Sequence, residues 1–307
     1  MIEIVKVEYH GWPNCYRLSN NLVELVITSD VGPRIIRFAF TGDANEFYED
    51  PQTRGLMGGD EWRLYGGHRL WHAPEIDGRT NAPDNAPVKI EPYQNGLRVI
   101  QAAETTGIHI QKEIDIKLAA DQPQVHLVHR LRNTGVWPVE LAPWSLSVMA
   151  GGGRAIIPLP PRGTHPEDLL PTGNIVLWAY VDMADSRWTW GRQHILLKQR
   201  AGGSPQKIGI GSAEGWLAYA NQGHLFVKLH RYVTGADYPD MGSSAEVFTN
   251  SDMLELETLG PLTTLSPGAT VEHVEQWYLL RDVPEPQTDA DVIQTVLPKI
   301  QAAVGMG

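Results

Sequence analysis

Hydrophobic and polar residues alternate with a period of two along much of the chain. The clearest example runs from Ile108 to Leu118 (IHIQKEIDIKL), where isoleucine or leucine fills every second position and Lys112 is the exception. Polar residues hold the positions between them, as in a strand with one buried and one exposed face. A turn at 121–123 (DQP) follows, and a second run of the same kind spans 124–133. The pattern predicts antiparallel strands joined by turns.

Similar runs recur elsewhere in the chain, with Gly, Pro, Asn and Asp between them. They span 21–29, 95–104, 194–199, 215–221, 224–233, 253–259 and 271–280. Many short strands at regular spacing are typical of a sandwich or barrel and not of a parallel α/β sheet. We therefore predict an all-β fold, with residues 1–307 forming a single large antiparallel β-sandwich domain.

The best candidate for a helix is the C-terminal stretch 288–303. Thr288 offers a cap, acidic residues follow in the first turn, and apolar residues then recur at helical spacing from Val292 to Ile300. Long loops are predicted at 41–66, 74–88, 150–174 and 181–191. In a compact all-β protein, such loops commonly carry function or cover a sheet edge.

Composition and charge narrow the classes of partner. The formal net charge of -11 argues against nucleic acid or an anionic membrane and fits a neutral or cationic ligand. Cys15 is the single cysteine, which excludes an internal disulfide and a zinc site built on several thiolates. The start lacks a signal-peptide pattern, and no apolar run reaches about 18 residues. We expect a cytoplasmic protein of undetermined oligomeric state, with no metal and no cofactor.

Tryptophan is unusually frequent. The chain has 10 Trp against 5 Phe. Tryptophan suits surfaces that need an apolar face with a polar edge, and sugar recognition is one such use. The alternative is that several of these residues cap sheet edges.

The segment 66–75, GGHRLWHAPE, concentrates chemically active residues. On a helix, His68, His72 and Glu75 would share one face and could hold a metal. Pro74 and the glycine pair oppose a helix, and Arg69 places a permanent positive charge beside the supposed cation. The segment is then an extended ligand loop or a polar turn.

In an extended conformation, the side chains of this segment separate into two groups. His68 and His72 point to one side, and Arg69 and Trp71 point to the other. The glycines would let the backbone approach a ligand closely. Arginine offers a planar donor fork for hydroxyls or a carboxylate, and histidine can exchange protons near neutral pH.

A second stretch, 253–259 (MLELETL), carries paired carboxylates. In a strand, Glu255 and Glu257 share one face, two positions apart. Like charges on one face raise each other's proton affinity, which suits a carboxylate for acid–base work. The alternative is a solvated strand face with two glutamates that have no function.

The C-terminal part resembles the end of the galactose mutarotase (aldose 1-epimerase) superfamily. Leu256-Glu257-Thr258, the Pro267-Gly268 turn and the strand after Val271 take the places of that family's Leu-Glu-Thr stretch, turn and final strand. The resemblance implies a supersandwich fold and a sugar substrate. It makes Glu257 the carboxylate that takes a proton from the anomeric hydroxyl.

Two further stretches extend the resemblance. NTGVWPVELAPWSLSVM, from Asn133, is similar to the mutarotase strand-turn-strand, but Trp144 stands where that family has its acid histidine. An indole cannot donate a proton to the ring oxygen, although it can stack on a sugar. The segment 66–75 falls where the family holds sugar hydroxyls. The sequence of this segment, together with LELETLGPL, resembles an uncharacterised DUF4380-like branch of the superfamily more closely than the mutarotases themselves.

Three functional hypotheses follow. The first is an aldose epimerase with Glu257 as base and His72, or else His68, as acid. In it, Arg69 and Glu75 would bind hydroxyls, and Trp71 and Trp144 would stack on the sugar. The second is a non-catalytic protein that binds a sugar or oligosaccharide in the same cleft. The third is a glycoside hydrolase or lyase, which would need two carboxylates across the cleft for hydrolysis.

Three more residues are candidates for substrate binding. Arg34, in VGPRIIRF, follows a Gly-Pro turn that borders the site in the family. Lys207, before IGIG, could bind an anionic substituent. Asp240, in YPDMG, could reach the same cleft from a loop.

Overall fold

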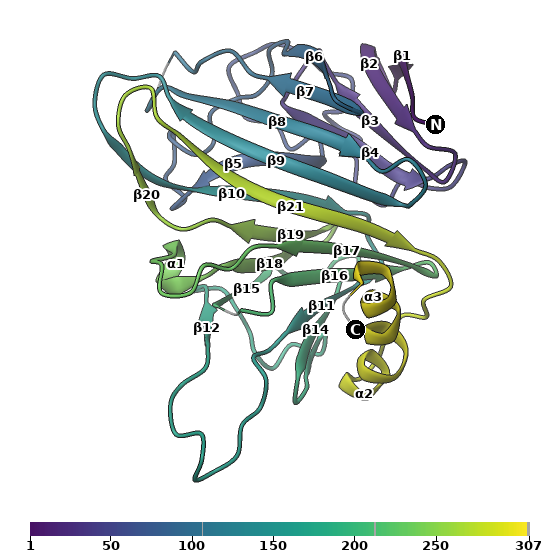
Figure 1. Ribbon diagram of the computed structural model, residues 1–307, viewed down its shortest axis with the longest axis vertical. Coiled ribbons are helices and arrows are strands. Elements are labelled where there is room, and N and C mark those ends of the chain that lie inside the picture. The colour runs from purple at the N-terminus through teal and green to yellow at the C-terminus, as the bar shows by residue number, and fades with distance from the viewer. Residues whose placement is uncertain (106, 212, 306–307) are drawn as a thin grey trace.

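The strands form two antiparallel sheets that pack against each other (Figure 1). The computed structural model describes residues 1–105, 107–211 and 213–305, and the strands named here are those of that part of the chain. The larger sheet contains, in spatial order, β1 (Glu3–Tyr9), β2 (Trp12–Ser19), β3 (Val23–Thr28), β4 (Arg34–Phe40), β5 (Gly67–Ala73), β10 (Val139–Met149), β19 (Leu254–Leu259), β18 (Ala245–Thr249), β15 (Gln206–Gly211) and β12 (Asn174–Leu177), with β20 (Thr263–Leu265) paired to β10.

The smaller sheet contains, in spatial order, β13 (Trp188–Trp190), β14 (His194–Lys198), β11 (Arg154–Pro158), β16 (Trp216–Asn221), β17 (His224–His230), β21 (Thr270–Leu280), β9 (Gln124–Asn133), β8 (Ile110–Leu118), β7 (Gly96–Ile100) and β6 (Lys89–Tyr93). The predicted all-β sandwich is therefore confirmed.

The main hydrophobic core lies between the two sheets. On β8 the alternating residues Ile110, Ile114 and Ile116 are completely buried in it. Lys112, the exception in that pattern, is also buried, and its ammonium lies 3.0 Å from a carboxylate oxygen of Glu104. Because this ion pair neutralises the charge, the strand keeps its register although a lysine occupies an inward position.

The C-terminal helical segment is confirmed. It begins with α2 (Asp289–Asp291), continues as a π-helical turn (Val292–Val296) and ends with α3 (Leu297–Val304). Thr288 caps it in a reciprocal capping box with Asp291. Its apolar residues pack on the outer face of the smaller sheet, against strands that include β16 and β17 (Figure 1). A second helical turn, α1 (Pro239–Gly242), precedes β18.

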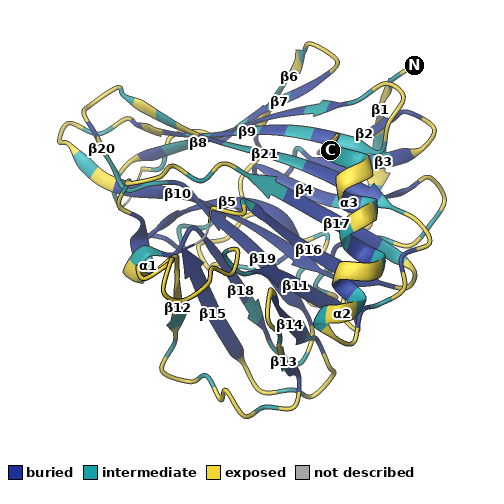
Figure 2. Cartoon of the chain, turned by 60° about the horizontal axis from the view of Figure 1, so that its bottom comes forward, coloured by how far each residue is buried: buried dark blue, intermediate teal, exposed yellow. Residues whose placement is uncertain are grey.

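The central strands of the larger sheet are buried on both faces. Every residue of β5 and of β19 is buried, as the dark blue ribbons in Figure 2 illustrate. One face packs on the core, and loop segments that include 62–64 and 178–180 cover part of the other face. The candidate site lies under these loops. None of the helices described here is long and apolar enough to cross a membrane.

Candidate functional site

Strand β5 carries most of the GGHRLWHAPE segment, and its two faces meet different surroundings. His68 Nδ1 lies 3.0 Å from Ser147 Oγ, and His68 Nε2 lies 2.8 Å from Nε2 of His129 on the smaller sheet. This side chain therefore points between the sheets. Arg69 and Trp71 line a cavity on the opposite face. The segment is a strand with two distinct faces, as its extended interpretation predicts.

The two histidines do not reach the face that carries Glu257. Both are completely buried, and His68 is part of the network between the sheets. Burial lowers the pKa of His72 to about 3, and Lys112 and Arg79 contribute to this shift. The expectation that His72 or His68 shares a pocket with Glu257 is corrected. Successive residues of a strand point to opposite sheet faces, and Glu257 lies on the face of Arg69, opposite to that of the two histidines.

The two glycines that begin this segment serve the protein's own packing. Gly66 and Gly67 have φ values of +97° and +69°. An added Cβ would lie 2.0 Å from the Tyr48 carbonyl oxygen at the first position and 2.3 Å from the Ile35 carbonyl oxygen at the second. These positions need glycine because neighbouring backbone is close, which corrects the expectation of a close approach to a ligand.

The cavity on the outer face of the larger sheet has a volume of about 490 Å³. This is within the range of small-molecule sites, roughly 300–1,000 Å³. Its walls are mainly aromatic and apolar, with a few charged groups. It is lined by Trp62, Leu64, Arg69, Trp71, Glu75, Trp144, Leu146, Trp178, Tyr180, Lys207, Phe248, Asn250, Met253 and Glu255.

The guanidinium of Arg69 lies in the cavity wall, and two of its donors make no hydrogen bond within the described part of the protein. It lies 4.3 Å from the ring centre of Trp71 and 5.7 Å from that of Trp62. Nη2 donates to Glu255 Oε1 at 3.0 Å. Nε and Nη1 have no hydrogen-bond partner among the described residues, although the side chain is only 3% exposed. Such unpaired buried donors are costly unless a ligand or water accepts from them.

Glu257 lies beneath the cavity floor in a charged cluster. Its Oε2 accepts a hydrogen bond from the Trp144 indole at 2.8 Å and one from Lys207 Nζ at 2.9 Å. Its Oε1 has no partner among the described residues. Trp144 is 2% exposed, so little of its ring surface is open for the predicted stacking on a sugar.

Lys207 is already neutralised by the protein. Its ammonium lies 2.7 Å from Glu246 and 2.9 Å from Glu257. It also lies over the rings of Trp144 and Trp178, 4.8 and 4.7 Å from their centres. Burial alone would lower the pKa of Lys207, but the carboxylates of Glu257 and Glu246 outweigh it and raise the pKa. The expected role in binding an anionic substituent is thus not supported.

Glu75 and Asp240 differ in their access to the cavity. Glu75 lines it and is exposed. Partial burial raises the pKa of Glu75, Glu257 and Asp240 raise it further, and Lys207 and Arg69 oppose them. Asp240 is not part of the lining. Burial also raises its pKa, and a hydrogen bond to Glu246 opposes this effect.

Arg34 lies outside the cavity lining, contrary to its predicted contact with a ligand. Its guanidinium donates to the carbonyl oxygens of Leu64 and Gly66 and lies 2.6 Å from Asp84. It therefore fixes the chain where it enters β5 and acts on the site only through that position.

Several lining residues were not anticipated from the sequence. Trp178 and Tyr180 follow edge strand β12, and Trp62 comes from the long loop before β5. Burial raises the pKa of Tyr180 to about 12. The abundance of tryptophan and the long loop at 41–66 were the available signals, but neither shows which residues meet.

The inner face of β5 borders a cluster with the residue types of a metal site. One ligand atom each from His68, His129 and Glu275 lie within 4.8 Å of one another. However, Lys228 Nζ lies 2.9 Å from Glu275 Oε1, and its positive charge opposes a cation there. The Trp277 indole donates to the other carboxylate oxygen. These groups satisfy one another, so the cluster belongs to sheet packing.

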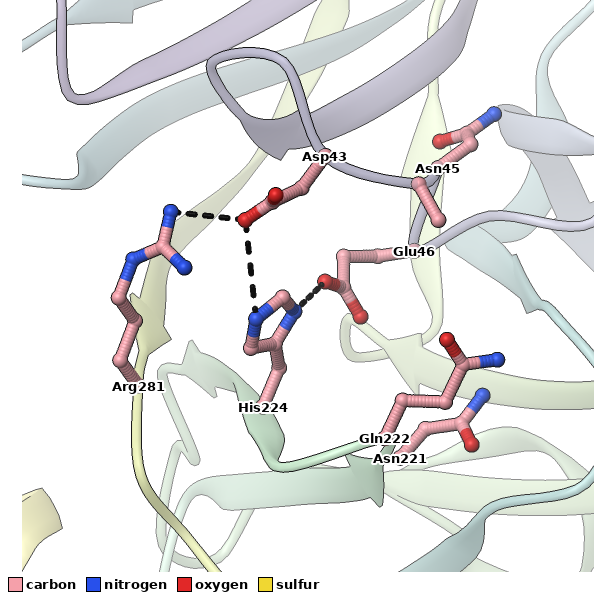
Figure 3. Close-up of a pocket in the computed structure, with 8 residues that line it drawn as sticks. Asp43, Asn45, Glu46, Asn221, Gln222, His224 and Arg281 are labelled. Carbon is pink, nitrogen blue, oxygen red and sulfur yellow. Dashed lines mark hydrogen bonds and ion pairs between the residues drawn. The ribbon is translucent and has the colours of Figure 1, made fainter.

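A smaller polar pocket of about 270 Å³ lies at the start of β17 (Figure 3). His224 Nδ1 lies 2.7 Å from Glu46, and Arg281 lies 2.7 Å from Asp43. Burial raises the pKa of Glu46, and His224 opposes that shift. Because these charged groups pair with one another and none is a predicted site residue, the tryptophan-lined cavity is the stronger candidate.

Comparison with known proteins identifies the fold class. No protein-family model matches the chain, and a search of curated proteins gives no match. The solved structure of the Slr1438 protein from Synechocystis sp. PCC 6803 superposes with a TM-score of 0.59 at 10% identity, covering 90% of this chain and 99% of that one. A galactose mutarotase-like protein from Lactobacillus casei gives 0.55 at 8% identity, covering 91% and 100%.

A galactose mutarotase-like protein from Clostridium acetobutylicum gives a TM-score of 0.51 at 11% identity, covering 91% of this chain and 99% of its own. At such low identity the likeness shows the fold alone. The predicted galactose mutarotase-like fold is therefore confirmed.

Proposed function

We propose that the protein binds a sugar in the tryptophan-lined cavity. The observation that carries the proposal is the Arg69 side chain, which lines the cavity, is stacked on tryptophan and keeps two buried donors without a partner among the described residues of the protein. Sugar hydroxyls would accept from these donors, while the aromatic walls would pack on the apolar faces of the ring. The mutarotase-like fold of the chain agrees with a carbohydrate ligand.

Isothermal titration calorimetry tests this proposal. A panel of aldoses and their short oligosaccharides is titrated into the wild type, Arg69→Met and the control Arg17→Met, which alters a partly exposed arginine paired with Glu3 outside the cavity lining. We expect at least one sugar to bind the wild type and the control equally, and Arg69→Met to bind it at least about 10-fold more weakly. Equal binding by a folded Arg69→Met, or no binding by any sugar, contradicts the proposal.

Aldose epimerisation is a second candidate function. It is favoured by two carboxyl groups, one of which could accept a proton while the other could donate one. Glu257 has one unpaired oxygen beneath the cavity floor, which could take the proton of the anomeric hydroxyl if the floor opens to the ligand. Glu75 lines the cavity and has a raised pKa, so it could deliver a proton to the ring oxygen as the ring opens. In this scheme Glu75 replaces the acid that was expected from His72 or His68.

Exchange spectroscopy between the two anomers separates binding from turnover. An epimerase accelerates interconversion above the blank rate, Glu257→Gln abolishes the acceleration, and Glu75→Gln lowers it about 10²-fold or more. A wild type that binds a sugar but leaves interconversion at the blank rate is a binding protein.

A further inference from the structure

The cavity region contains more carboxyl groups than cations. Glu75, Asp240, Glu246, Glu255 and Glu257 influence one another's charge there, and the cations that oppose them at the cavity, among the described residues, are Arg69 and Lys207. Carboxyl groups therefore outnumber cations at the site itself, as they do over the whole chain.

The internal pairing leaves one lining carboxylate open. Glu255 is paired with Arg69, and Lys207 serves both Glu246 and Glu257. Glu75 also lines the cavity. Its side chain forms no hydrogen bond or ion pair with any other described residue. Over the described part of the chain, the cavity lining therefore contains an unpaired carboxyl group, that of Glu75, and an arginine with donors that lack a partner, Arg69.

Lys207 shows how this region stabilises an ammonium group. Two carboxylates and two tryptophan rings surround its Nζ, at 2.7 and 2.9 Å and at 4.7 and 4.8 Å. Both carboxylate pairing and cation–π contact favour a cation in a partly dry site. A ligand's ammonium would find the same kinds of group at Glu75 and the aromatic walls.

We infer that the sugar bound in this cavity carries a protonated amine, whose ammonium group pairs with the Glu75 carboxylate while its hydroxyl oxygens accept from Arg69. This inference rests on the proposed sugar binding and adds the substrate class. A phosphate or carboxylate substituent would face the surplus carboxylates, and both cations are already paired. Amino sugars are thus preferred over neutral hexoses, and neutral hexoses over hexose phosphates.

Calorimetry at pH 7 and low salt tests the preference with matched ligands. Glucosamine, galactosamine and mannosamine are each compared with the parent hexose, the N-acetyl derivative and the hexose 6-phosphate. We expect at least one amino sugar to bind about 10-fold or more tightly than its parent and its N-acetyl derivative, the effect of one charge-assisted hydrogen bond. The phosphate should bind more weakly than the parent.

Two variants test whether Glu75 causes the preference for an amino sugar. Glu75→Gln should reduce the preference for the amine to about 2-fold or less while the parent hexose still binds. Asp77→Asn removes the same charge from an exposed position of the same loop outside the cavity lining, and should keep the preference. A preference that survives in Glu75→Gln overturns the assignment.

The outcomes separate this inference from the proposed function. If a neutral hexose or a hexose phosphate binds as tightly as the amino sugar, the amine inference is overturned and sugar binding stands. If no sugar of any kind binds, the proposed function fails and the inference fails with it.

Discussion

His68 on the inner face of β5 and Arg69 on its outer face are both buried, but they differ in how their hydrogen-bonding groups are satisfied. On the inner face, His68 joins a network in which Lys228, Glu275 and their neighbours satisfy one another. On the outer face, Arg69 is equally buried but keeps two donors without a partner. Chemically active residue types therefore do not identify a site by themselves. Unfilled hydrogen-bonding capacity beside a cavity is the more useful sign.

The largest expected effect is a loss of stability caused by a substitution in the buried network at the inner face of β5. Glu275→Gln leaves the buried ammonium of Lys228 without its counter-charge, and we expect the free energy of unfolding to fall by about 3–5 kcal/mol. Urea denaturation measures it. The control Glu75→Gln, at an exposed position of the outer face, should change stability by about 0.5 kcal/mol or less. Equal losses in the two variants would remove the distinction between the faces.

The next effect concerns the outer face. Arg69→Lys keeps the charge but loses the planar fork, so ligand affinity should fall about 10–100-fold. Titration calorimetry measures the affinity, with Arg17→Lys, outside the cavity lining, as the control. If the lysine variant binds as well as the wild type, the unpaired donors of Arg69 do not hold the ligand.

A third prediction uses the neutral state of His72. Its pKa of about 3 in the folded protein lies below the ordinary value of 6.5, so the unfolded chain takes up a proton first as the pH falls. The stability contributed by the neutral ring is complete above about pH 6.5 and is lost progressively below it, by about 2 kcal/mol at pH 5.

His72→Leu should remove this contribution. Between pH 7.5 and 5, the variant's free energy of unfolding should fall by about 2 kcal/mol less than that of the wild type. Urea denaturation at several pH values measures both. Parallel pH profiles would mean that His72 is not buried in its neutral form.

The smallest expected effect is at the cavity rim. Trp62 is 40% exposed and lies 5.7 Å from the Arg69 guanidinium, so Trp62→Ala should weaken ligand binding about 2- to 10-fold with little change in stability. Trp137→Ala, at a residue 78% exposed and outside the cavity lining, is the control. Equal affinities for both variants would exclude Trp62 from the site.

The fold could be predicted from the sequence because its signals are local. The period of two predicts the strands. The cap at Thr288 and the apolar spacing from Val292 to Ile300 predict the C-terminal helix. Lys112 was an unexplained exception, since its partner Glu104 is found only by following the fold.

The site could be predicted only in part. Arg69, Trp71 and Glu75 share one segment, and strand alternation separates the first two from the histidines. The pairing of Lys207 with Glu246 and Glu257 joins three strands, and no local pattern encodes it. His72 cannot serve as the predicted acid in the cavity, because its side chain lies on the inner face of β5, as that of His68 does.

The central claim is that a sugar binds on the outer face of β5. The most direct measurement is the ¹H–¹⁵N spectrum of the tryptophan indoles, assigned by single Trp→Phe substitutions and recorded with the tightest-binding sugar of the panel. We predict that the indole signals of Trp62, Trp71 and Trp178 shift on saturation, while that of Trp277, bonded to Glu275 between the sheets, stays in place. Unchanged cavity signals with every sugar, or a shift of Trp277 alone, would contradict the claim.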